Sequence, residues 1–330
     1  MRILVTGAAG FIGSNFVRHW RERHPDDHLV AYDLLTYAGN RANLPDEIPF
    51  VHGDIGDLEL AGRTLAEHDV GVVVNFAAES HNSFAVLDPG LFARTNVIGT
   101  QLLLEASRHA HVDRFHHIST CEVYGDLPLD SDDAFSETAP YRPRTPYNAS
   151  KAAADHYVRA YHETFGVPTT ITNCSNNYGP YQFPEKVIPL FITNALDDKP
   201  LPLYESTQNR REWLHVRDHC RAIERVLTAG TIGETYNVGS GVEKSIDEIA
   251  NAVLGALGKP QSLKEIVPDR PGHDRRYLLD STKLREELGW RDDVPFEEGL
   301  AETVRWYVDH RDWWQPLKER APVAEFTAWG

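Results

Sequence analysis

The N-terminal segment carries the pattern that most limits how this chain can fold. An apolar run at residues 3–5 is followed by a glycine-rich segment at residues 7–13 and then by apolar residues at helical spacing, Phe16, Val17 and Trp20. This order predicts a strand, a glycine turn and a helix. Glycines let the backbone approach a pyrophosphate closely, and the N-terminus of the helix favours its negative charge. The segment therefore predicts a dinucleotide site.

An acidic residue in the right place supports this prediction. A second strand, expected over residues 28–32, ends at Asp33, about 20 residues beyond the last glycine of the turn. A carboxylate there can accept hydrogen bonds from a ribose diol and repels a 2′-phosphate, so the sequence favours NAD over NADP. The alternative is an ordinary turn residue after a strand.

The strand and helix pattern then repeats along the first half of the chain. Apolar runs at residues 50–55, 72–78 and 115–119 alternate with segments of helical spacing. Near-continuous apolar strands of this kind indicate a parallel sheet with helices on both faces, which is a Rossmann-type α/β fold. Asp54, Ile55, Ala77 and Ala78 follow strand ends, where open α/β sheets bind ligands, although Asp54 could instead cap a helix.

Composition excludes several other classes of protein. The net charge of −16 argues against general nucleic-acid binding, so an anionic ligand would need locally placed arginines. The three cysteines, Cys121, Cys174 and Cys220, have no metal-ligand spacing, and we expect reduced thiols and no metal site. We expect a cytoplasmic protein without a membrane anchor, because there is no long apolar run and no signal-peptide pattern.

Two short segments carry groups suited to alcohol chemistry. Thr120, Cys121 and Glu122 follow a predicted strand, and Tyr147 and Lys151 stand four residues apart, on one side of a helical turn. An ammonium near a phenol favours the phenolate, which is a usable base near neutral pH. A Tyr and Lys at this spacing can also be a solvated surface pair, so the pair gains meaning only from the rest of the chain.

Longer motifs occur over nearly the whole chain, in one order. They are residues 6–13, 77–81, 176–181, 183–186, 211–213 and 270–277, together with Tyr147 and Lys151. With these motifs the chain resembles the extended short-chain dehydrogenase/reductases of the nucleotide-sugar branch, and it is most similar to dTDP-glucose 4,6-dehydratases. The resemblance implies an NAD-binding Rossmann domain at residues 1–175 and a smaller domain at residues 176–330, mainly for the nucleotide sugar, with some segments returning to the first domain.

The resemblance also implies roles for particular residues. Tyr147 would remove the proton from sugar O4, Lys151 would tune Tyr147 and touch the nicotinamide ribose, and Thr120 would hydrogen-bond near O4. The cofactor contacts it implies are Gly7, Gly10, Phe11, Ile12, Gly13, Asp33, Asp54, Ile55, Ala77, Ala78, Thr95, Tyr147, Lys151 and Asn177. The substrate contacts are Ser80, Thr120, Asn176, Lys186, Arg211, Arg270 and His273. Lys186 could instead form a surface ion pair, His273 could be a loop histidine, and relatives of this kind usually form homodimers.

The chain departs from these dehydratases at the site itself. Cys121 stands where they have an aspartic acid that protonates the leaving C6 hydroxyl, while the Glu122 equivalent removes the C5 proton. A thiol, with an ordinary pKa of about 8.5, is a weaker acid than a carboxyl group near 4. Residues 82–85 read Asn-Ser-Phe-Ala in place of Val-Asp-Arg-Ser, so this loop has lost two charges. Residues 205–207 and Asn148 also differ and leave the nucleotide base, UDP or dTDP, open.

These departures favour a different second step. UDP-glucuronate decarboxylases have Thr-Ser-Glu here, and cysteine is close in shape to serine. Oxidation at C4 of a glucuronate gives a β-keto acid, which loses CO2 without a leaving-group acid, and removing a carboxylate from position 121 avoids a repulsion of about 4 kcal/mol. We therefore expect decarboxylation of UDP-glucuronate to UDP-4-keto-pentose or UDP-xylose, with Thr120, Cys121, Glu122, Tyr147 and Lys151 as the catalytic residues.

Three alternatives remain. Cys121 could be a packing variant in a dTDP-glucose 4,6-dehydratase that forms dTDP-4-keto-6-deoxyglucose. A related reaction is 5,6-dehydration to an exocyclic alkene. A hypothesis of another class is a non-catalytic NAD-sensing protein, since folds outlast functions, although the retained Tyr147, Lys151 and Thr120 argue against it.

Overall fold

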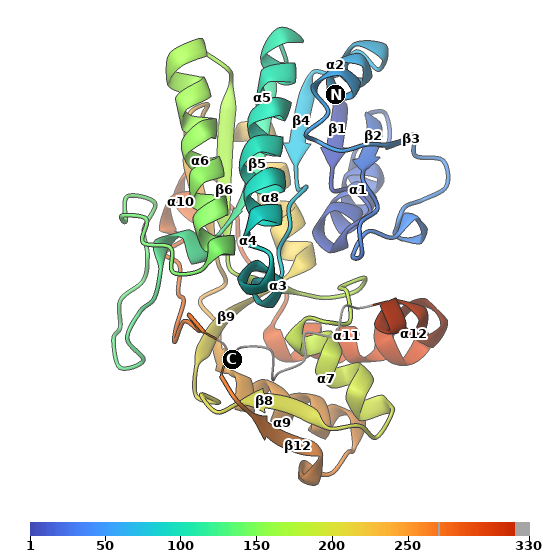
Figure 1. Ribbon diagram of the computed structural model, residues 1–330, viewed down its shortest axis with the longest axis vertical. Coiled ribbons are helices and arrows are strands. Elements are labelled where there is room, and N and C mark those ends of the chain that lie inside the picture. Colours follow the sequence, from blue (N-terminus) through green and yellow to red (C-terminus); the bar gives the residue numbers. More distant parts are fainter. Residues whose placement is uncertain (270, 321–330) are drawn as a thin grey trace.

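A parallel sheet of seven strands forms the upper half of the molecule in Figure 1, a computed structural model that describes residues 1–269 and 271–320. All neighbouring strands in this sheet pair in parallel. In spatial order they are β10 (Thr235–Val238), β6 (Thr169–Cys174), β5 (Arg114–Thr120), β4 (Val72–Asn75), β1 (Arg2–Thr6), β2 (His28–Asp33) and β3 (Phe50–His52). The strand order reverses between β1 and β4, and such a reversal opens a crevice at the carboxyl ends of the strands.

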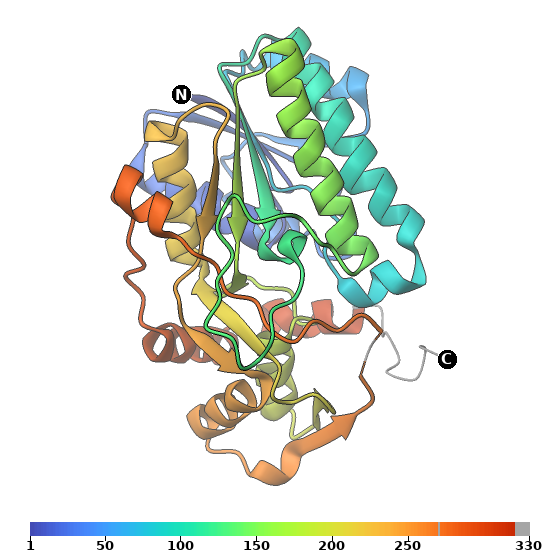
Figure 2. The ribbon, with the colours of Figure 1, turned by 90° about the vertical axis from the view of Figure 1, so that its left-hand side faces the viewer.

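Helices cover both faces of this sheet, as the near-continuous apolar strands require. On one face, α1 (Phe11–Arg23) and α8 (Val216–Ala229) pack in a shared core that includes Trp20 and Ile223. On the other face, α2 (Leu58–Glu67), α5 (Thr100–His109) and α6 (Pro146–Phe165) bury Leu65, Leu104 and Val158. Figure 2 shows the sheet edge-on between these layers. The predicted Rossmann-type fold is therefore confirmed.

Helix α6 places the Tyr and Lys pair, and its ends follow from the local sequence. Thr145 is the N-cap, and its hydroxyl accepts a hydrogen bond from the backbone N–H of Asn148 at 3.2 Å. Pro146 occupies the first turn, where its missing N–H costs nothing. Gly166 ends the helix in the left-handed conformation, with φ of 70°. The first turn of α6 thus lies at the carboxyl end of β5.

The second half of the chain contributes to both parts of the molecule. Strand β10 belongs to the upper sheet, and helix α8 packs against one face of it. The lower part in Figure 1 has its own core around Phe191, Trp213 and Leu254. Its strands are β7 (Asn176–Tyr178), β8 (Leu201–Tyr204), β9 (Arg210–His215), β11 (Glu243–Ser245) and β12 (Lys264–Val267), and its helices are α7 (Val187–Leu196), α9 (Ile246–Leu257), α11 (Phe296–Asp309) and α12 (Arg311–Arg320). We propose the division into residues 1–175 and 176–330, with β10 and α8 as the segments that return.

Short elements complete the described chain. They are α3 (Asn82–Leu87), α4 (Pro89–Phe92), α10 (Thr282–Leu288), the 3-10 turns η1 (Arg41–Asn43), η3 (Cys121–Tyr124) and η4 (Gln261–Leu263), and the π-helix η2 (Ala93–Gly99). Across residues 1–269 and 271–320, we find no helix of the length and apolar character that a membrane crossing requires.

The glycine turn after β1 has no space for larger residues. Gly7 has a φ of +64°, and a Cβ at Gly13 would overlap the carbonyl oxygen of Gly7. We expect Gly13→Ala to push the first turn of α1 away from the loop, lowering the affinity for NAD at least about tenfold. Calorimetric titration with NAD and thermal unfolding would measure both effects.

Gly62 provides the matched control. It lies within α2, and a Cβ there would have no neighbour within 4 Å. Gly62→Ala should leave NAD affinity unchanged and stabilise the protein by about 1 kcal/mol, because alanine is the better helix former. Equal NAD affinity in the Gly13→Ala and Gly62→Ala proteins would contradict the assignment of the turn.

Candidate active site

A cavity of about 320 Å³ lies at the carboxyl ends of the central strands. The structure brings every residue expected to contact the cofactor to its lining. These residues are Gly7, Gly10, Phe11, Ile12, Gly13, Asp33, Asp54, Ile55, Ala77, Ala78, Thr95, Tyr147, Lys151 and Asn177. Thr95 lies in the π-helix η2, a type of helix often found at functional sites. The lining suits a dinucleotide such as NAD, because backbone and carboxylate groups meet at the reversal point of the sheet.

Asp33 links the glycine turn to this cavity. Its side chain is 9% exposed, and its two oxygens accept hydrogen bonds from the backbone N–H groups of Ala9 at 2.9 Å and Leu35 at 2.7 Å. Burial raises the pKa of Asp33, and these two hydrogen bonds oppose the rise. The carboxylate therefore holds the turn in place and also lines the cavity. Asp54, at the exposed rim, also accepts from Gly56 N at 2.8 Å and caps its own turn.

A second cavity, of about 640 Å³, lies beside the first. Of the residues expected to bind the substrate, Ser80, Asn176, Lys186, Arg211 and His273 line it, whereas Thr120 lines the first cavity. Ser80, Glu122, Asn176 and Lys186 line both cavities, so the two meet at these residues. Arg270 lies outside the described residues.

Arg211 is the buried cation of the second cavity. It is 6% exposed, and it donates hydrogen bonds to the carbonyl oxygens of Asp274 at 2.8 Å and Arg275 at 3.2 Å. Its guanidinium also lies 4.8 Å from the ring centroid of Tyr277. Carbonyl oxygens orient the guanidinium without neutralising its charge, so it suits an anionic group such as a diphosphate. Two further basic candidates, Lys186 and His273, already have protein partners. Lys186 donates to Ser80 O at 2.9 Å, and His273 Nδ1 lies 3.1 Å from Ser206 Oγ.

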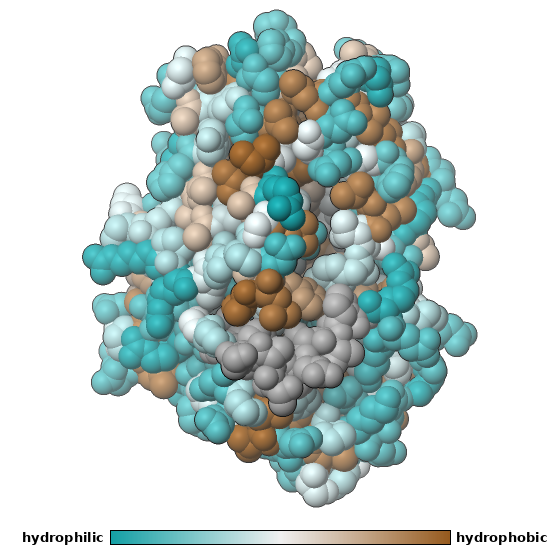
Figure 3. All heavy atoms as spheres, viewed as in Figure 1, coloured by the Kyte–Doolittle hydropathy of each residue, from teal (hydrophilic) through white to brown (hydrophobic). Residues whose placement is uncertain are grey.

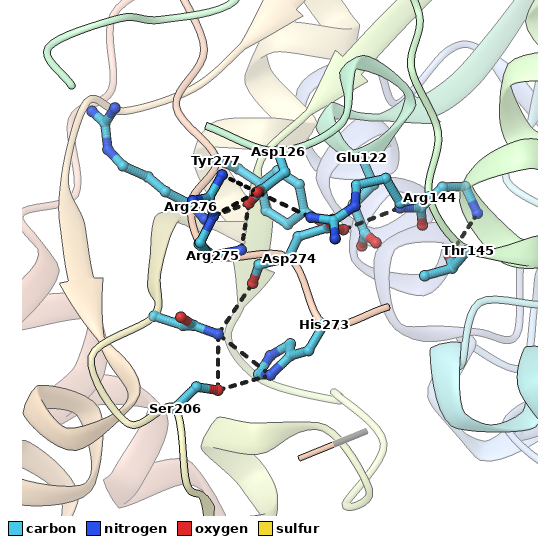
Figure 4. A network of polar contacts seen from close by, with 12 residues as sticks. Glu122, Asp126, Arg144, Thr145, Ser206, His273, Asp274, Arg275, Arg276 and Tyr277 are labelled. Carbon is cyan, nitrogen blue, oxygen red and sulfur yellow. Dashed lines mark hydrogen bonds and ion pairs between the residues drawn. The ribbon is translucent and has the colours of Figure 1, made fainter. Parts of the chain in front are cut away.

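Figure 4 shows how the segment that carries His273 and Tyr277 is held against the upper half of the molecule. Asp126, in the loop after η3, accepts from Arg275 Nε at 2.7 Å and pairs with Arg144 at 3.0 Å. Arg144 also pairs with Asp274 at 3.2 Å. These ion pairs join the segment of Asp274 and Arg275 to Asp126, which follows Glu122 in the chain, and to Arg144, which directly precedes Thr145.

The candidate catalytic residues meet at the end of β5 and the start of α6. Thr120 hydrogen-bonds to the Tyr147 phenol, but burial and the charge of Glu122 raise the pKa of Tyr147 well above its ordinary value. Lys151 donates to Ile118 O at 2.7 Å and lies 3.2 Å from His117 Nε2. The described hydrogen bonds of Lys151 therefore go to β5, so any effect of Lys151 on the phenol acts through its charge. The positive charge of a nicotinamide ring would oppose this rise in the phenol pKa.

Cys121 is 1% exposed and packs in an apolar cluster with Val123, Tyr124 and Ala152. Burial, followed by the charge of Glu122, raises the pKa of its thiol well above the ordinary value. Cys121 is therefore a protonated thiol and a weak acid at neutral pH. Glu122 accepts a hydrogen bond from Asn82 Nδ2 at 3.0 Å, and it lies where the two cavities meet.

Sequence reasoning missed a buried carboxylate behind Lys151. Asp155 is fully buried and accepts from Ser119 Oγ at 2.9 Å and Tyr141 Oη at 2.8 Å. One of its oxygens lies 3.6 Å from His117 Nε2. Burial lowers the pKa of Lys151 to about 8, and the negative charge of Asp155 opposes this shift. The signal was present in the sequence, since Asp155 follows Lys151 by one helical turn.

The fold, the Tyr147 and Lys151 pair and the joined cavities define a short-chain dehydrogenase/reductase of the nucleotide-sugar branch. Residues 4–303 match the family model described as GDP-mannose 4,6 dehydratase. The match covers most of the chain, and the protein belongs to this family. The resemblance that the motifs indicated is confirmed.

Two relatives and one solved structure resemble this chain over nearly its full length. The chain is 49% identical over 327 residues to a dTDP-glucose 4,6-dehydratase of Streptomyces niveus, covering 96% of both chains. It is 50% identical over 336 residues to that of Xanthomonas campestris, covering 94% of both. The structure of DesIV, a dTDP-glucose 4,6-dehydratase from Streptomyces venezuelae with NAD and TYD bound, aligns with a TM-score of 0.92 and 49% identity, covering 96% of this chain and 100% of that one.

These comparisons do not support the decarboxylation of UDP-glucuronate that we expected, and they favour the dehydratase alternative. The expectation gave one substitution, Cys121, more weight than the similarity of the whole chain. In the structure Cys121 is buried in an apolar cluster, so packing as well as acidity bears on the residue at this position.

The buried pair of Lys151 and Asp155 leads to a pH-dependent prediction. If Lys151 acts as an ammonium, oxidation of the nucleotide sugar falls as the pH rises through about 8. Asp155→Asn removes the anion that helps Lys151 keep its proton, so this alkaline limb should move down by about one pH unit or more. The pH dependence of kcat for the two proteins would measure the shift.

Asp130→Asn is the control, because Asp130 is an exposed carboxylate outside both cavities. Its pH profile should match that of the unmodified protein. An unchanged alkaline limb in a folded Asp155→Asn protein would contradict the role of Asp155.

Proposed function

We propose that this protein is an NAD-dependent dTDP-glucose 4,6-dehydratase that forms dTDP-4-keto-6-deoxyglucose. The observation that carries the proposal is the position of Glu122, which lines both cavities and lies beside Thr120 and Tyr147. A carboxylate there can reach C5 of a hexose whose C4 faces the cofactor cavity. Full-length relatives of nearly half-identical sequence support the same assignment.

The first step is oxidation of the sugar alcohol at C4. Tyr147 takes the O4 proton, and Thr120, hydrogen-bonded to the phenol, orients the reacting oxygen. The residues that line the first cavity would hold NAD, which would supply a hydride acceptor for C4 and, after the loss of water, a hydride donor for C6 while C5 regains a proton. Lys151 holds a positive charge at the end of β5, where it favours the phenolate and the developing negative charge.

The second step is the elimination of water across C5 and C6. The C4 ketone makes the C5 proton acidic, and Glu122 removes it. The leaving C6 hydroxide needs a proton, which in this chain comes from the Cys121 thiol. Because burial raises the pKa of Cys121, proton donation is unfavourable, and we expect loss of water to be slower than oxidation at C4.

Glu122 alone does not separate a neutral hexose from a hexuronate, because UDP-glucuronate decarboxylases have a glutamate at the same place. Similarity over the whole chain supports the dehydratase. A non-catalytic NAD sensor would have no use for the buried Thr120, Tyr147 and Lys151 group.

We also propose a cytoplasmic homodimer that forms through the helices of the first domain. Apolar side chains gather over α5 and α6 on the face shown in Figure 3. Ile98, Tyr157 and Phe165, from η2 and α6, are 50%, 40% and 53% exposed, and apolar side chains gathered on one surface often mark a protein–protein contact. Light scattering that gives the mass of a single chain would contradict the dimer.

Product masses test the reaction itself. Purified protein incubated with NAD and dTDP-glucose should give a product lighter by one water, whereas UDP-glucuronate should be unchanged. Mass spectrometry of both reactions decides between the two chemistries. Loss of CO2 from UDP-glucuronate without turnover of dTDP-glucose would overturn the proposal, and the absence of any product from either would favour the sensor.

Changing Cys121 tests the leaving-group step. Cys121→Asp introduces a stronger acid and should raise the rate of water loss on the order of 10-fold or more, if folding is retained. Cys121→Ser is the matched control, because a hydroxyl fits the same space and is no better an acid. Single-turnover measurement of the keto product follows both variants, and equal rates in Cys121→Asp and Cys121→Ser would contradict the proton-donor role.

A further inference from the structure

Asn82 connects the candidate base to the helix that carries the candidate phenol. We propose that Asn82 is a positioning residue that orients the Glu122 carboxylate for removal of the C5 proton and keeps it ionised, with Thr145 fixing the orientation of Asn82. This inference rests on the proposed function, in which Glu122 acts at C5. It concerns the first residue of the loop at residues 82–85, to which the sequence analysis gave no role of its own.

The contacts form a chain of three hydrogen bonds. Asn82 Nδ2 donates to Glu122 Oε2 at 3.0 Å, and Thr145 Oγ1 donates to Asn82 Oδ1 at 2.8 Å. The same hydroxyl accepts from the backbone N–H of Asn148 at 3.2 Å as the N-cap of α6. Glu122 is therefore held relative to the first turn of α6, where Tyr147 lies. These hydrogen bonds therefore fix Glu122, proposed to act at C5, relative to Tyr147, proposed to act at O4.

The direction of each bond is determined by the donors present. The Thr145 hydroxyl has a single proton, which it gives to the carbonyl oxygen of the Asn82 amide. A flipped amide would place that oxygen against the Glu122 carboxylate and bring two acceptors together. The amide N–H must therefore face Glu122, and it stabilises the charged form of the carboxylate.

A purely structural role explains Asn82 less well. It is the first residue of α3, whose N-cap His81 makes no side-chain capping bond, so Asn82 is not needed to begin the helix. Its amide reaches 40 residues along the chain to Glu122 and 63 residues to Thr145. The amide thus adds polar contacts at the reacting carboxylate and at the cap of α6.

The neighbours of Glu122 make a hydrogen-bond donor valuable. Its charge raises the pKa of Cys121, Tyr147, Cys174 and Tyr277, which come from η3, α6, β6 and the segment after Arg276. These thiols and phenols are neutral at pH 7. The positive charge of Arg211 is near enough to Cys121, the neighbour of Glu122, to lower the pKa of its thiol. Loss of the Asn82 amide should therefore make the carboxylate take up its proton at a higher pH.

The proton transfer balances without another reactant. The C5–H bond breaks, its electron pair enters the C4 carbonyl to form an enolate, and the proton passes to a carboxylate oxygen of Glu122. Asn82 takes no part in the bond changes. Asn82 also lines the second cavity, but its amide contacts Glu122, so its substitution should lower kcat more than it changes KM for the nucleotide sugar.

Asn82→Leu in the full-length protein tests the inference. Leucine keeps the approximate size and removes the amide. With dTDP-glucose, we expect kcat to fall on the order of 10- to 100-fold. The acidic limb of the pH profile should move up by about one unit, and incorporation of deuterium from D2O at C5 should slow in proportion. Unfolding temperature is measured in parallel, so that a loss of folded protein is recognised.

Thr145 provides the matched pair of variants. Thr145→Ser keeps the hydroxyl and should retain the pH profile of the unmodified protein. Thr145→Val removes it and should shift the acidic limb in the same direction as Asn82→Leu. If Asn82→Leu lowers stability or kcat without moving the acidic limb, Asn82 is structural and the inference is overturned.

A readout independent of turnover separates the two proposals. The carboxyl carbon of Glu122 can be followed by NMR in protein labelled with 13C-glutamate and assigned with Glu122→Gln. Its titration midpoint should rise in Asn82→Leu, even if dTDP-glucose proves not to be the substrate. No dehydration by the unmodified protein would refute the proposed function, whereas an unchanged midpoint would refute the role of Asn82.

Discussion

Helix α6 lies against strand β5 with ionisable side chains at positions where a buried helix usually has apolar ones. Lys151 and Asp155 are both buried there, next to His117 and Ser119 of β5. Burying a charge is costly unless an opposite charge and hydrogen bonds accompany it, so each of these groups needs the others. The contact holds the ammonium, the phenol of Tyr147 and Thr120 at one end of the sheet, and the cofactor and substrate cavities are built around it.

Much of the upper half could be predicted from sequence, because local patterns determine it. The apolar runs and the glycine turn gave the parallel sheet, and the residues that follow strand ends necessarily meet at one edge. Boundaries were less accurate. The run at residues 50–55 forms only β3 (Phe50–His52), since Gly53 packs against the ring of Tyr32, and the run at 72–78 ends as β4 at Asn75.

The chemistry at the site was harder to predict, because it depends on contacts between distant residues. The partners of Lys151 proved to be a strand carbonyl and His117, and the spacing of Tyr147 and Lys151 could not reveal them. The contact of Asn82 with Glu122 and Thr145 likewise has no local signal. Cys121 was misleading because one weak acid at the site was given more weight than the similarity of the whole chain, although burial does make the thiol a still weaker acid.

The junction of the two cavities has a consequence for how such an enzyme fits into a cell. Lys186, from the lower half, bonds to the Ser80 carbonyl of the upper half where the cavities meet, so a nucleotide sugar in the second cavity would cover this side of the dinucleotide cavity. A dehydratase of the proposed kind leaves its dinucleotide in the starting oxidation state after each turnover. The dinucleotide can therefore stay behind this junction as a permanent part of the protein. Flux through the enzyme then depends on the supply of sugar and not on the ratio of oxidised to reduced nicotinamide in its surroundings.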